Sequence, residues 1–296
     1  MFKNSLIKGV FLVGLGASSY GILATFVKIA YKEGYTTAEV STSQFILGII
    51  GLLLINGFQK ITSKKKIPKT SKKEILKLMI AGTSMGFTSI FYYLSVHYIP
   101  VSIGIVLLMQ TVWMAVALEA ILLKKVPTLQ KTFSVFIVLL GTFFATNLLD
   151  NNFQIDWRGI LFGLLAAASF TTTMFTANSI VTTISTVQRS LYMLIGGALI
   201  VLTFAFFYQN TPYNFDIFLK WGLLLSFFGT IIPPLLMNAG FPLTGIGLGS
   251  IVSSIELPVS VFMAYILLNE KVSIVQWLGI ILILFAVVLI NRNKKN

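Results

Sequence analysis

Long apolar runs separated by short polar links dominate the chain. Four are single runs of roughly one membrane thickness, at residues 9–27, 40–59, 132–149 and 272–291. Residues 78–118 contain no Asp, Glu, Lys or Arg and are long enough for two spans, divided at 97–100. Two further spans are assigned to 158–189 and 190–215. The last two occupy 221–268 and are divided at 241–245. Because hydrocarbon offers no partner for unpaired backbone groups, each span is predicted to be a helix. The pattern therefore predicts an all-α integral membrane protein with ten transmembrane helices.

Composition supports a membrane protein and excludes a water-soluble enzyme. Of the 296 residues, 56% are hydrophobic and only 10% are charged. The mean hydropathy is +0.89, whereas a soluble domain carries about a quarter charged residues. The chain has no cysteine and one histidine, which excludes disulfides and thiolate metal sites and gives a zinc site little support. A phosphate-binding loop of the Gly-x-x-x-x-Gly-Lys-Ser/Thr type does not occur, which argues against direct ATP drive. We therefore expect neither a metal nor a cofactor.

The formal net charge of +13 is explained by its distribution along the chain. With the N-terminus in the cytoplasm, all but five of the 22 Lys and Arg residues fall on the cytoplasmic side. The five others are Lys28, Lys32, Arg158, Lys220 and Lys271. This asymmetry follows the positive-inside rule, so lipids rather than nucleic acid are the expected charged partner. The first apolar run lacks a small-residue cleavage pattern and is predicted to be a retained span. We expect a multi-pass protein of a bacterial inner (plasma) membrane with both termini in the cytoplasm.

An internal repeat appears when the chain is shifted against itself by about 145 positions. The shift superposes spans two and seven, where Thr37, Ile50, Gly51, Leu54 and Ile55 meet Thr182, Ile195, Gly196, Leu199 and Ile200. The alternative is chance similarity between helices rich in Leu and Ile. Five spans per half is an odd number, so the halves are predicted to lie in opposite membrane orientations. We assign 1–149 to the first five-helix repeat and 150–296 to the second, within one membrane domain. Inverted repeats are typical of alternating-access transporters.

The end of the second repeat carries the most specific motif, which consists of Pro258, then Leu267–Glu270, then Gln276–Gly279. With these residues the chain resembles the EamA-type ten-span members of the drug/metabolite transporter superfamily, along essentially its whole length. The first half departs from the pattern, because the position equivalent to Pro258 is Trp113 and the position equivalent to Glu270 is Lys125. The resemblance implies a bundle of ten helices that transports small organic solutes, often exporting amino acids or related metabolites.

Glu256 is the leading candidate for a functional residue. It lies near the centre of span nine, where an ionised carboxylate is costly and usually faces a cavity or a partner. At helical spacing it shares a polar stripe with Gly249, Ser253 and Ser260. Its predicted role is a coupling proton site or a counter-charge for a substrate amine. The alternatives are a structural pair with Lys28 or Arg189, or a protonated acid bonded to a neighbouring helix.

Prolines predict interrupted helices in spans eight and nine. Pro258 frees a backbone carbonyl one turn earlier, and Pro233 and Pro234 lie at mid-depth with Asn238 a turn further on. Broken helices that line a cavity commonly expose such carbonyls to a substrate. The alternative is a kink that serves packing alone.

Spans three and four supply further candidate binding residues. Trp113 lies deep in the membrane beside Gln110 and Thr111, and forms either one wall of a site for an apolar solute or core filling. Tyr92 belongs to a small-polar stripe on span three with Ser84, Thr88 and Ser95. Such stripes commonly serve helix packing, and several of them meeting a central Glu would form a polar cavity.

Two charged residues near the cytoplasmic side are weaker candidates. Glu119 falls about one turn from the end of its span and is expected to reach toward Lys124 or the interface. Arg189 begins span seven and could attract an anionic carboxylate or a lipid headgroup.

Together these features predict a secondary transporter that is not an enzyme. It would move small organic metabolites by alternating access, with export of amino acids or related compounds and with protons as the candidate coupling ion. The alternatives are an uncoupled facilitator or channel for the same solutes and, with less support, a polytopic enzyme acting on lipid-borne substrates. The sequence does not indicate an oligomeric state.

Overall fold

The computed structural model of the chain describes residues 2–62, 70–99, 101–146, 156–269 and 271–292. Within these ranges the regular elements are helices and no strand occurs. Pro100 and Glu270, which were used in the sequence analysis, lie outside the described residues, and so does the predicted boundary between repeats at 149/150.

Ten helical segments follow one another along the described chain. The first five are α1 (Phe2–Lys32), α2 (Thr37–Thr62), α3 (Lys72–Tyr98), the pair α4 (Val101–Leu108) and α5 (Thr111–Leu123), and α6 (Leu129–Ala145). The next two are α7 (Trp157–Ser179) and α8 (Thr186–Tyr208). The eighth is one continuous run of η2 (Phe218–Gly222), α9 (Leu223–Ser226), η3 (Phe227–Ile231) and α10 (Ile232–Thr244). The last two are the pair α11 (Ile246–Ser253) and α12 (Glu256–Leu268), and α13 (Ile274–Arg292).

The length and apolar character of these segments confirm the predicted membrane fold. Eight of the segments in the described ranges are long and apolar enough to cross a membrane. The remaining two, α6 and α13, are shorter apolar helices. The all-α fold with ten transmembrane helices, predicted from charge-free runs alone, is therefore confirmed.

The two halves of the chain repeat the same helices. α4 and α11 begin at residues 101 and 246, and α5 and α12 begin at 111 and 256, so both pairs share the offset of 145 found in the sequence. Both pairs also have equal lengths. The residues that follow α5 and α12, Lys124 and Asn269, are equivalent and have the same φ of 51°. The repeat therefore extends to the backbone conformation of single residues.

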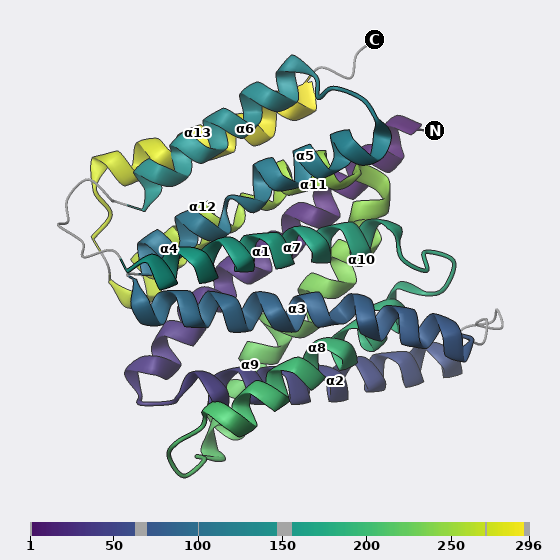
Figure 1. The fold of residues 1–296 in the computed structure, drawn as a ribbon, viewed down its shortest axis with the longest axis vertical. Helices are drawn as coiled ribbons and strands as arrows, with labels where there is room; N and C mark the ends of the chain where they lie inside the picture. The colour runs from purple at the N-terminus through teal and green to yellow at the C-terminus, as the bar shows by residue number, and fades with distance from the viewer. Residues whose placement is uncertain (1, 63–69, 100, 147–155, 270, 293–296) are drawn as a thin grey trace.

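Contacts between helices follow the same two-fold relation. α3 packs on α7 and α8, and its counterpart, the run from Phe218 to Thr244, packs on α1 and α2. α2 pairs with α8 and α6 pairs with α13, so equivalent helices meet across the two halves (Figure 1). Because each half has an odd number of spans, this arrangement consists of two inverted five-helix repeats.

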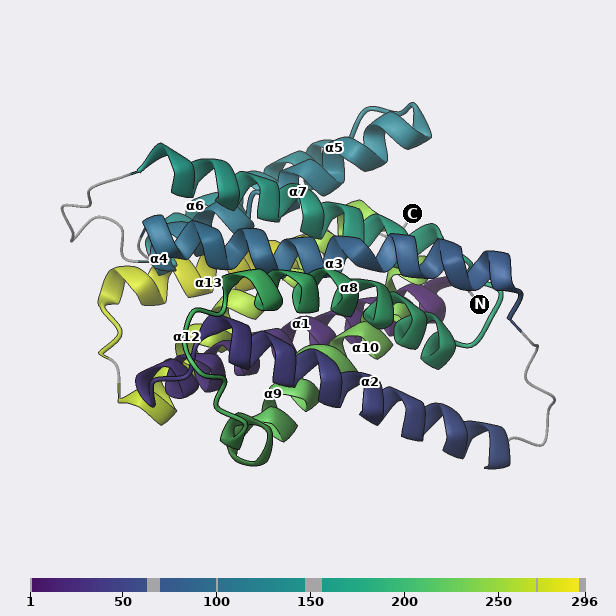
Figure 2. The same cartoon turned by 60° about the horizontal axis from the view of Figure 1, so that its bottom comes forward.

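Positive charge gathers at one end of the bundle. The start of α1, the end of α2, the start of α3 and the end of α13 all lie at this end, as both views show (Figures 1 and 2). Lys60, Lys72, Lys124 and Lys131 belong to helix ends and links on this side, which we call the basic end. The other end, which carries Glu39, is called the opposite end.

Glycines set the closest helix approach, which is between α3 and α8. A methyl group on Gly82 would overlap the backbone carbonyl of Met193, and one on Gly196 would overlap that of Met79. Gly196 is one of the positions that the repeat relates to the first half, where Gly51 lies against the side chain of Ile231. Without apolar driving force between helices in lipid, such backbone proximity is a main source of helix association.

Candidate functional site

A small cavity lies between the halves of the bundle, with a volume of about 20 Å³. Its wall is formed by α1, α3, α7, α8 and α10, and it is mainly thioether and aromatic. The lining residues are Tyr20, Met85, Phe170, Thr173, Met174, Ala177, Met193, Pro234, Met237, Asn238 and Phe241. This volume holds about one water molecule. The space is therefore too small for an organic solute as it stands, and the flexible methionine side chains allow the wall to repack around a larger occupant.

Asn238 supplies the unpaired polar atom of the cavity wall. Its side chain is only 3% exposed, and its Nδ2 donates to Ser190 Oγ over 2.9 Å. Its Oδ1 is buried and has no hydrogen-bond partner among the described residues. A buried acceptor without a donor costs roughly 1–3 kcal/mol, so this oxygen is suited to receive a donor from a ligand.

Arg189 binds the backbone carbonyl of Asn238, which lacks its usual helical donor because residue 242 is a proline. In a regular helix the Asn238 carbonyl would accept from residue 242, but proline has no N–H. Arg189 Nη1 donates to this carbonyl over 2.8 Å. The same guanidinium donates from Nη2 to Ala177 O over 2.7 Å and from Nε to Ile180 O over 3.1 Å, at the C-terminal end of α7. Arg189, which is 2% exposed, thus joins α7, α8 and α10.

Arg189 therefore has a different environment from the one considered in the sequence analysis. Each of its partners among the described residues is a backbone carbonyl, and the negative end of the α7 dipole favours a cation there. It does not pair with Glu256 in this structure.

Glu256 is the first residue of α12 and is not among the residues that line the cavity. Its Oε2 is buried without a hydrogen-bond partner among the described residues. The backbone carbonyl of Glu256 is pressed against Gly21 of α1, where an added Cβ would meet it at 2.5 Å. Gly21 directly follows Tyr20, which lines the cavity, so this backbone contact packs the start of α12 against the part of α1 that contributes to the cavity wall.

The predicted helix break at Pro258 is present, and its freed carbonyl already has a partner. Proline removes the donor that would reach Ser254 O, and Leu257 N–H donates there instead over 3.2 Å. The first repeat has the same bond at the equivalent place, from Val112 N–H to Met109 O over 3.1 Å, although Trp113 stands in place of the proline. Packing within the bundle thus imposes the break in both halves.

Pro233 has a related effect in the eighth segment. In the π-helical turn before it, Ile232 N–H donates to Phe227 O. The next carbonyl, Phe228 O, would need a donor from residue 233, which has none. Ser19 Oγ of α1 supplies that bond over 2.9 Å. This carbonyl therefore joins the eighth segment to α1.

The other predicted site residues lie in several environments. Trp113 is 43% exposed, and its Nε1 donates to Gln110 Oε1 over 2.9 Å. Thr111 is buried and shares a hydrogen bond of 2.8 Å with Thr171 Oγ1 of α7. Of the predicted site residues, the cavity wall includes Asn238 and Pro234.

Two further predicted residues are placed on α11 and α3. Ser253 is buried and donates to Ser250 O over 2.8 Å within α11. Tyr92 is partly buried beside Tyr93, with ring centres 6.1 Å apart.

Sequence reasoning missed the methionines, which dominate the wall. Met85, Met174, Met193 and Met237 lie on four different helices. Four of the nine methionines of the chain thus meet at one point. In the sequence, a methionine in an apolar run is indistinguishable from core filling.

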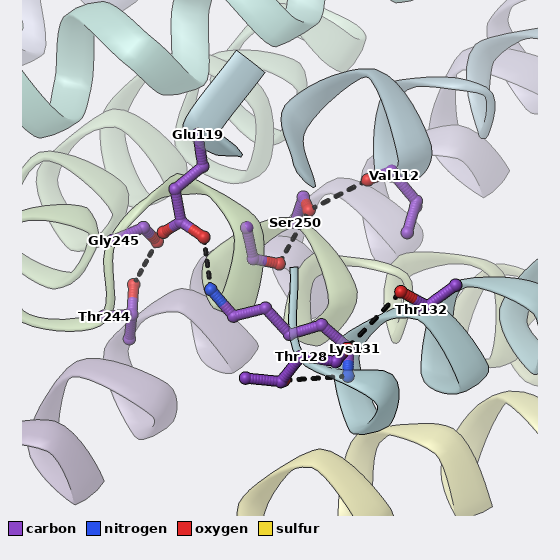
Figure 3. Close-up of polar contacts among 9 residues, drawn as sticks. Val112, Glu119, Thr128, Lys131, Thr132, Thr244, Gly245 and Ser250 are labelled. Atoms are coloured by element: carbon purple, nitrogen blue, oxygen red, sulfur yellow. Dashed lines mark hydrogen bonds and ion pairs between the residues drawn. The ribbon is translucent and has the colours of Figure 1, made fainter. Parts of the chain in front are cut away.

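At the basic end, Glu119 of α5 forms an ion pair with Lys131 of α6 (Figure 3). Of the two alternatives predicted for Glu119, Lys124 or the interface, contact with Lys124 is not formed, because the carboxylate pairs with Lys131 and faces the first turn of α11. An added Cβ on Gly245 or Gly247 would meet its oxygens at 2.7 and 2.5 Å. We call these four residues the Glu119 lock; its acid and base come from the first repeat and its glycines from the second.

At the opposite end, Glu39 closes the contact between the repeats. Its Oε1 accepts from Asn214 N–H over 2.7 Å and from Gln209 Nε2 over 3.3 Å. Thr36 Oγ1 donates to Gln209 Oε1 over 2.8 Å. Tyr213 OH donates to Glu39 O over 3.3 Å, and burial raises the pKa of Tyr213 to about 12, which keeps it a neutral donor. We call Thr36, Glu39, Gln209, Tyr213 and Asn214 the Glu39 clamp.

The Glu119 lock can be tested by a mutant cycle. Replacing Lys131 with methionine is expected to destabilise the protein by about 2 kcal/mol, because a mostly buried carboxylate loses its partner. This is less than for a fully buried pair, since the Lys131 side chain is 26% exposed. The double variant Glu119→Leu, Lys131→Met should recover most of the loss in melting temperature. A double variant that melts below the single one would contradict this description.

These features define a multi-pass membrane protein with two inverted repeats and a small cavity between them. The model of the EamA-like transporter family matches residues 7–147 and again residues 157–292, so the chain belongs to that family. As a member it is a membrane transporter of small solutes. The predicted division at 149/150 stays a prediction.

Comparison with solved structures supports the same architecture. A structure described only as "Crystal structure of protein" is similar to this chain with a TM-score of 0.73. The two chains are 12% identical, and the match covers 94% of this chain and 97% of the other. At this identity the likeness concerns the fold alone. No curated protein matches the chain.

Proposed function

We propose that this protein is a secondary transporter that moves small organic metabolites by alternating access, with export of amino acids or related compounds. The observation that carries the proposal is the small cavity lined by helices of both halves, together with the buried and unpartnered Oε2 of Glu256 on α12, which packs against α1 next to the cavity residue Tyr20. In transporters with inverted repeats, substrates bind near the midplane at the interface of the repeats. Here the cavity joins α1 and α3 of the first repeat with α7, α8 and α10 of the second.

Contacts at the two ends support an alternating mechanism. The Glu119 lock and the Glu39 clamp each bring residues of the first repeat against residues of the second. With both in place, the two repeats are held together at both ends of the bundle. Opening toward the basic end requires the Glu119 lock to separate, and opening toward the other side requires the Glu39 clamp to separate.

Glu256 is the proposed coupling group. A carboxyl group in a membrane interior without a hydrogen-bond partner on Oε2 is costly when ionised, and a proton or a substrate cation relieves that cost. Competition between the two for one carboxylate would exchange protons for substrate. We also propose a bacterial inner (plasma) membrane as the location, with the basic end and both termini in the cytoplasm, because positive residues favour that side.

Flux in proteoliposomes tests the proposal. A pH gradient is expected to drive uptake of a transported solute by the unmodified protein, and Glu256→Gln should reduce that gradient-driven flux at least ten-fold. Glu74→Gln is the matched control, since Glu74 is an exposed capping acid at the start of α3 and glutamine caps a helix equally well. Its flux should be unchanged.

The possible results separate the parts of the proposal. Gradient-driven flux that survives in Glu256→Gln would remove the coupling role of this residue. Saturable counterflow without any response to the pH gradient would indicate an uncoupled facilitator. An absence of flux for every solute in a screen of amino acids, amines and nucleosides would contradict the proposed substrate class.

A further inference from the structure

Two aromatic residues of the cavity wall, Tyr20 of α1 and Phe170 of α7, occupy equivalent positions in the two repeats. The sequence shows this, because residues 17–20 read Ala-Ser-Ser-Tyr and residues 167–170 read Ala-Ala-Ser-Phe. These segments are 150 residues apart. We call Tyr20 and Phe170 the axial ring pair.

Helix packing gives the same relation between α1 and α7. Gly9 and Gly159 are also 150 residues apart, and both lie against the end of a helix in the other repeat. An added Cβ on Gly9 would meet the side chain of Leu243 at 2.7 Å, and one on Gly159 would meet that of Tyr98 at 3.1 Å. Leu243 and Tyr98 are themselves 145 residues apart, which is the shift that relates α4 to α11. The equivalence of α1 and α7 is therefore present in three dimensions.

The axial ring pair lies at the centre of the molecule. The two rings meet edge to face, with their centres 6.4 Å apart. Equivalent residues touch each other only next to the two-fold axis that relates the repeats. In inverted repeats this axis lies in the membrane plane, and substrates bind near it at the midplane. Tyr20 and Phe170 thus mark the midplane position at which a transported solute would be held.

The wall around the axial ring pair favours an aromatic body. Four methionines, each from a different helix, border the same cavity, and thioethers make favourable contacts with rings and adapt to different shapes. When a solute separates the two rings, they lose their contact with each other. An aromatic solute restores a ring contact on each side, whereas a saturated body of the same size does not.

Two polar side-chain atoms of the wall are available to a solute. The Tyr20 hydroxyl makes no hydrogen bond within the described part of the chain, and neither does Asn238 Oδ1. The Asn238 amide nitrogen already donates to Ser190 Oγ, and the Thr173 hydroxyl is engaged with Ser84 Oγ. Because the phenol offers a donor and the amide oxygen an acceptor, a solute that pairs with both needs an acceptor and a donor of its own.

We infer that Tyr20, Phe170 and Asn238 form a midplane site for aromatic solutes that carry a hydrogen-bond acceptor and a donor side by side, such as aromatic carboxamides and heteroaromatic lactams. This inference rests on the proposed function and narrows its substrate class. The solute ring lies between the rings of the axial pair as the methionines repack. Its carbonyl oxygen accepts from the Tyr20 hydroxyl, and its N–H donates to Asn238 Oδ1.

Three related probes test the inference on the full-length purified protein, with affinity measured from the ligand-induced rise in melting temperature. Benzamide carries all the required groups. N,N-dimethylbenzamide keeps the ring and the carbonyl but has no N–H, and it should bind about five-fold more weakly. Cyclohexanecarboxamide keeps the amide but has no aromatic ring, and it should bind about three-fold more weakly. Equal affinity of benzamide and either of the other probes would overturn the inference.

Variants assign the contacts to residues. Asn238→Leu should weaken benzamide binding and leave N,N-dimethylbenzamide binding unchanged, because only benzamide has the N–H. Tyr20→Phe keeps the ring and should weaken the binding of both, each by about five-fold. Phe170→Leu should abolish the preference for benzamide over cyclohexanecarboxamide. Should Asn238→Leu fail to fold, the nearly isosteric Tyr20→Phe variant still decides the question, since unchanged benzamide affinity in that variant would overturn the assigned contacts.

Phe162→Leu is the matched control for Phe170→Leu. Phe162 also belongs to α7 and stacks on another ring, that of Phe91, with centres 6.3 Å apart, but it does not line the cavity. Its replacement should leave the preference for benzamide unchanged. An equal loss of preference in both variants would show that general packing of α7, and not contact with Phe170, causes the effect.

Flux measurements distinguish this inference from the proposed function. Selective binding of benzamide without flux of any solute would support the midplane site and contradict the proposed function. Flux of other solutes through a protein that does not bind benzamide would contradict the inference while the transporter assignment stands.

Discussion

Replacing Gly82 with leucine is expected to lower the stability of the protein by about 3 kcal/mol or more, since overpacking at a rigid contact exceeds the usual cost of an added side chain. The first added carbon would overlap the carbonyl of Met193, and backbone cannot rotate away as a side chain can. At about 2–4 °C per kcal/mol for a chain of this size class, the melting temperature should fall by roughly 10 °C. Thermal unfolding in detergent measures the change.

Gly57→Leu is the matched control for this prediction. Gly57 lies in α2, and a Cβ built there has nothing within 4 Å. Leucine also has a higher helix propensity than glycine, so this variant should melt at or above the temperature of the unmodified protein. A Gly82→Leu variant that melts like Gly57→Leu would show that α3 and α8 are not held at backbone contact.

The architecture was predictable because the bilayer imposes it. Charge-free runs of about one membrane thickness can only be helices. The divisions predicted at 97–100 and 241–245 are followed by helices that begin at 101 and 246, which are 145 residues apart. Even so, the sequence misjudged the cause of the breaks. It assigned the ninth-span break to Pro258, yet the equivalent break occurs beside Trp113, where no proline is present.

The candidate site was predictable only where a polar residue stands out in an apolar run. Glu256 and Asn238 were predicted in this way, and of the two it is Asn238 that lines the cavity. The methionine wall was not, since Met85 and Met237 resemble core residues until helices are placed side by side. The face on which Trp113 lies depends on the rotation of α5 in the bundle, which an almost uniformly apolar helix does not reveal.

The contact between Arg189 and the Asn238 carbonyl was predictable only in part. That Pro242 leaves the Asn238 carbonyl without a helical donor can be read from the spacing of four residues. That a guanidinium from another helix fills the gap depends on tertiary packing. The pair nevertheless explains why a lone buried cation is tolerated next to an apolar cavity.

Arg189→Met is expected to destabilise the protein by about 2–4 kcal/mol, because buried carbonyls of Asn238 and Ala177 lose their donors and each such loss costs about 1–3 kcal/mol. The end of α7 also loses a cation that its dipole favours. The control is Arg158→Met, since Arg158 pairs with Asp156 at the surface and its side chain is 51% exposed. Surface pairs of this kind contribute little, so this variant should melt within a few degrees of the unmodified protein.

A second substitution tests the reason given for the Arg189 contact. If the Asn238 carbonyl needs Arg189 because Pro242 has no N–H, then alanine at position 242 supplies the missing helical donor. Pro242→Ala should therefore raise the melting temperature of the Arg189→Met variant, by the equivalent of about 1 kcal/mol for one restored hydrogen bond. In the unmodified background the new N–H competes with Arg189 for one carbonyl, so the gain there should be smaller. Equal effects of Pro242→Ala in both backgrounds would mean that the proline and the arginine act independently, and the proposed origin of the buried guanidinium would be wrong.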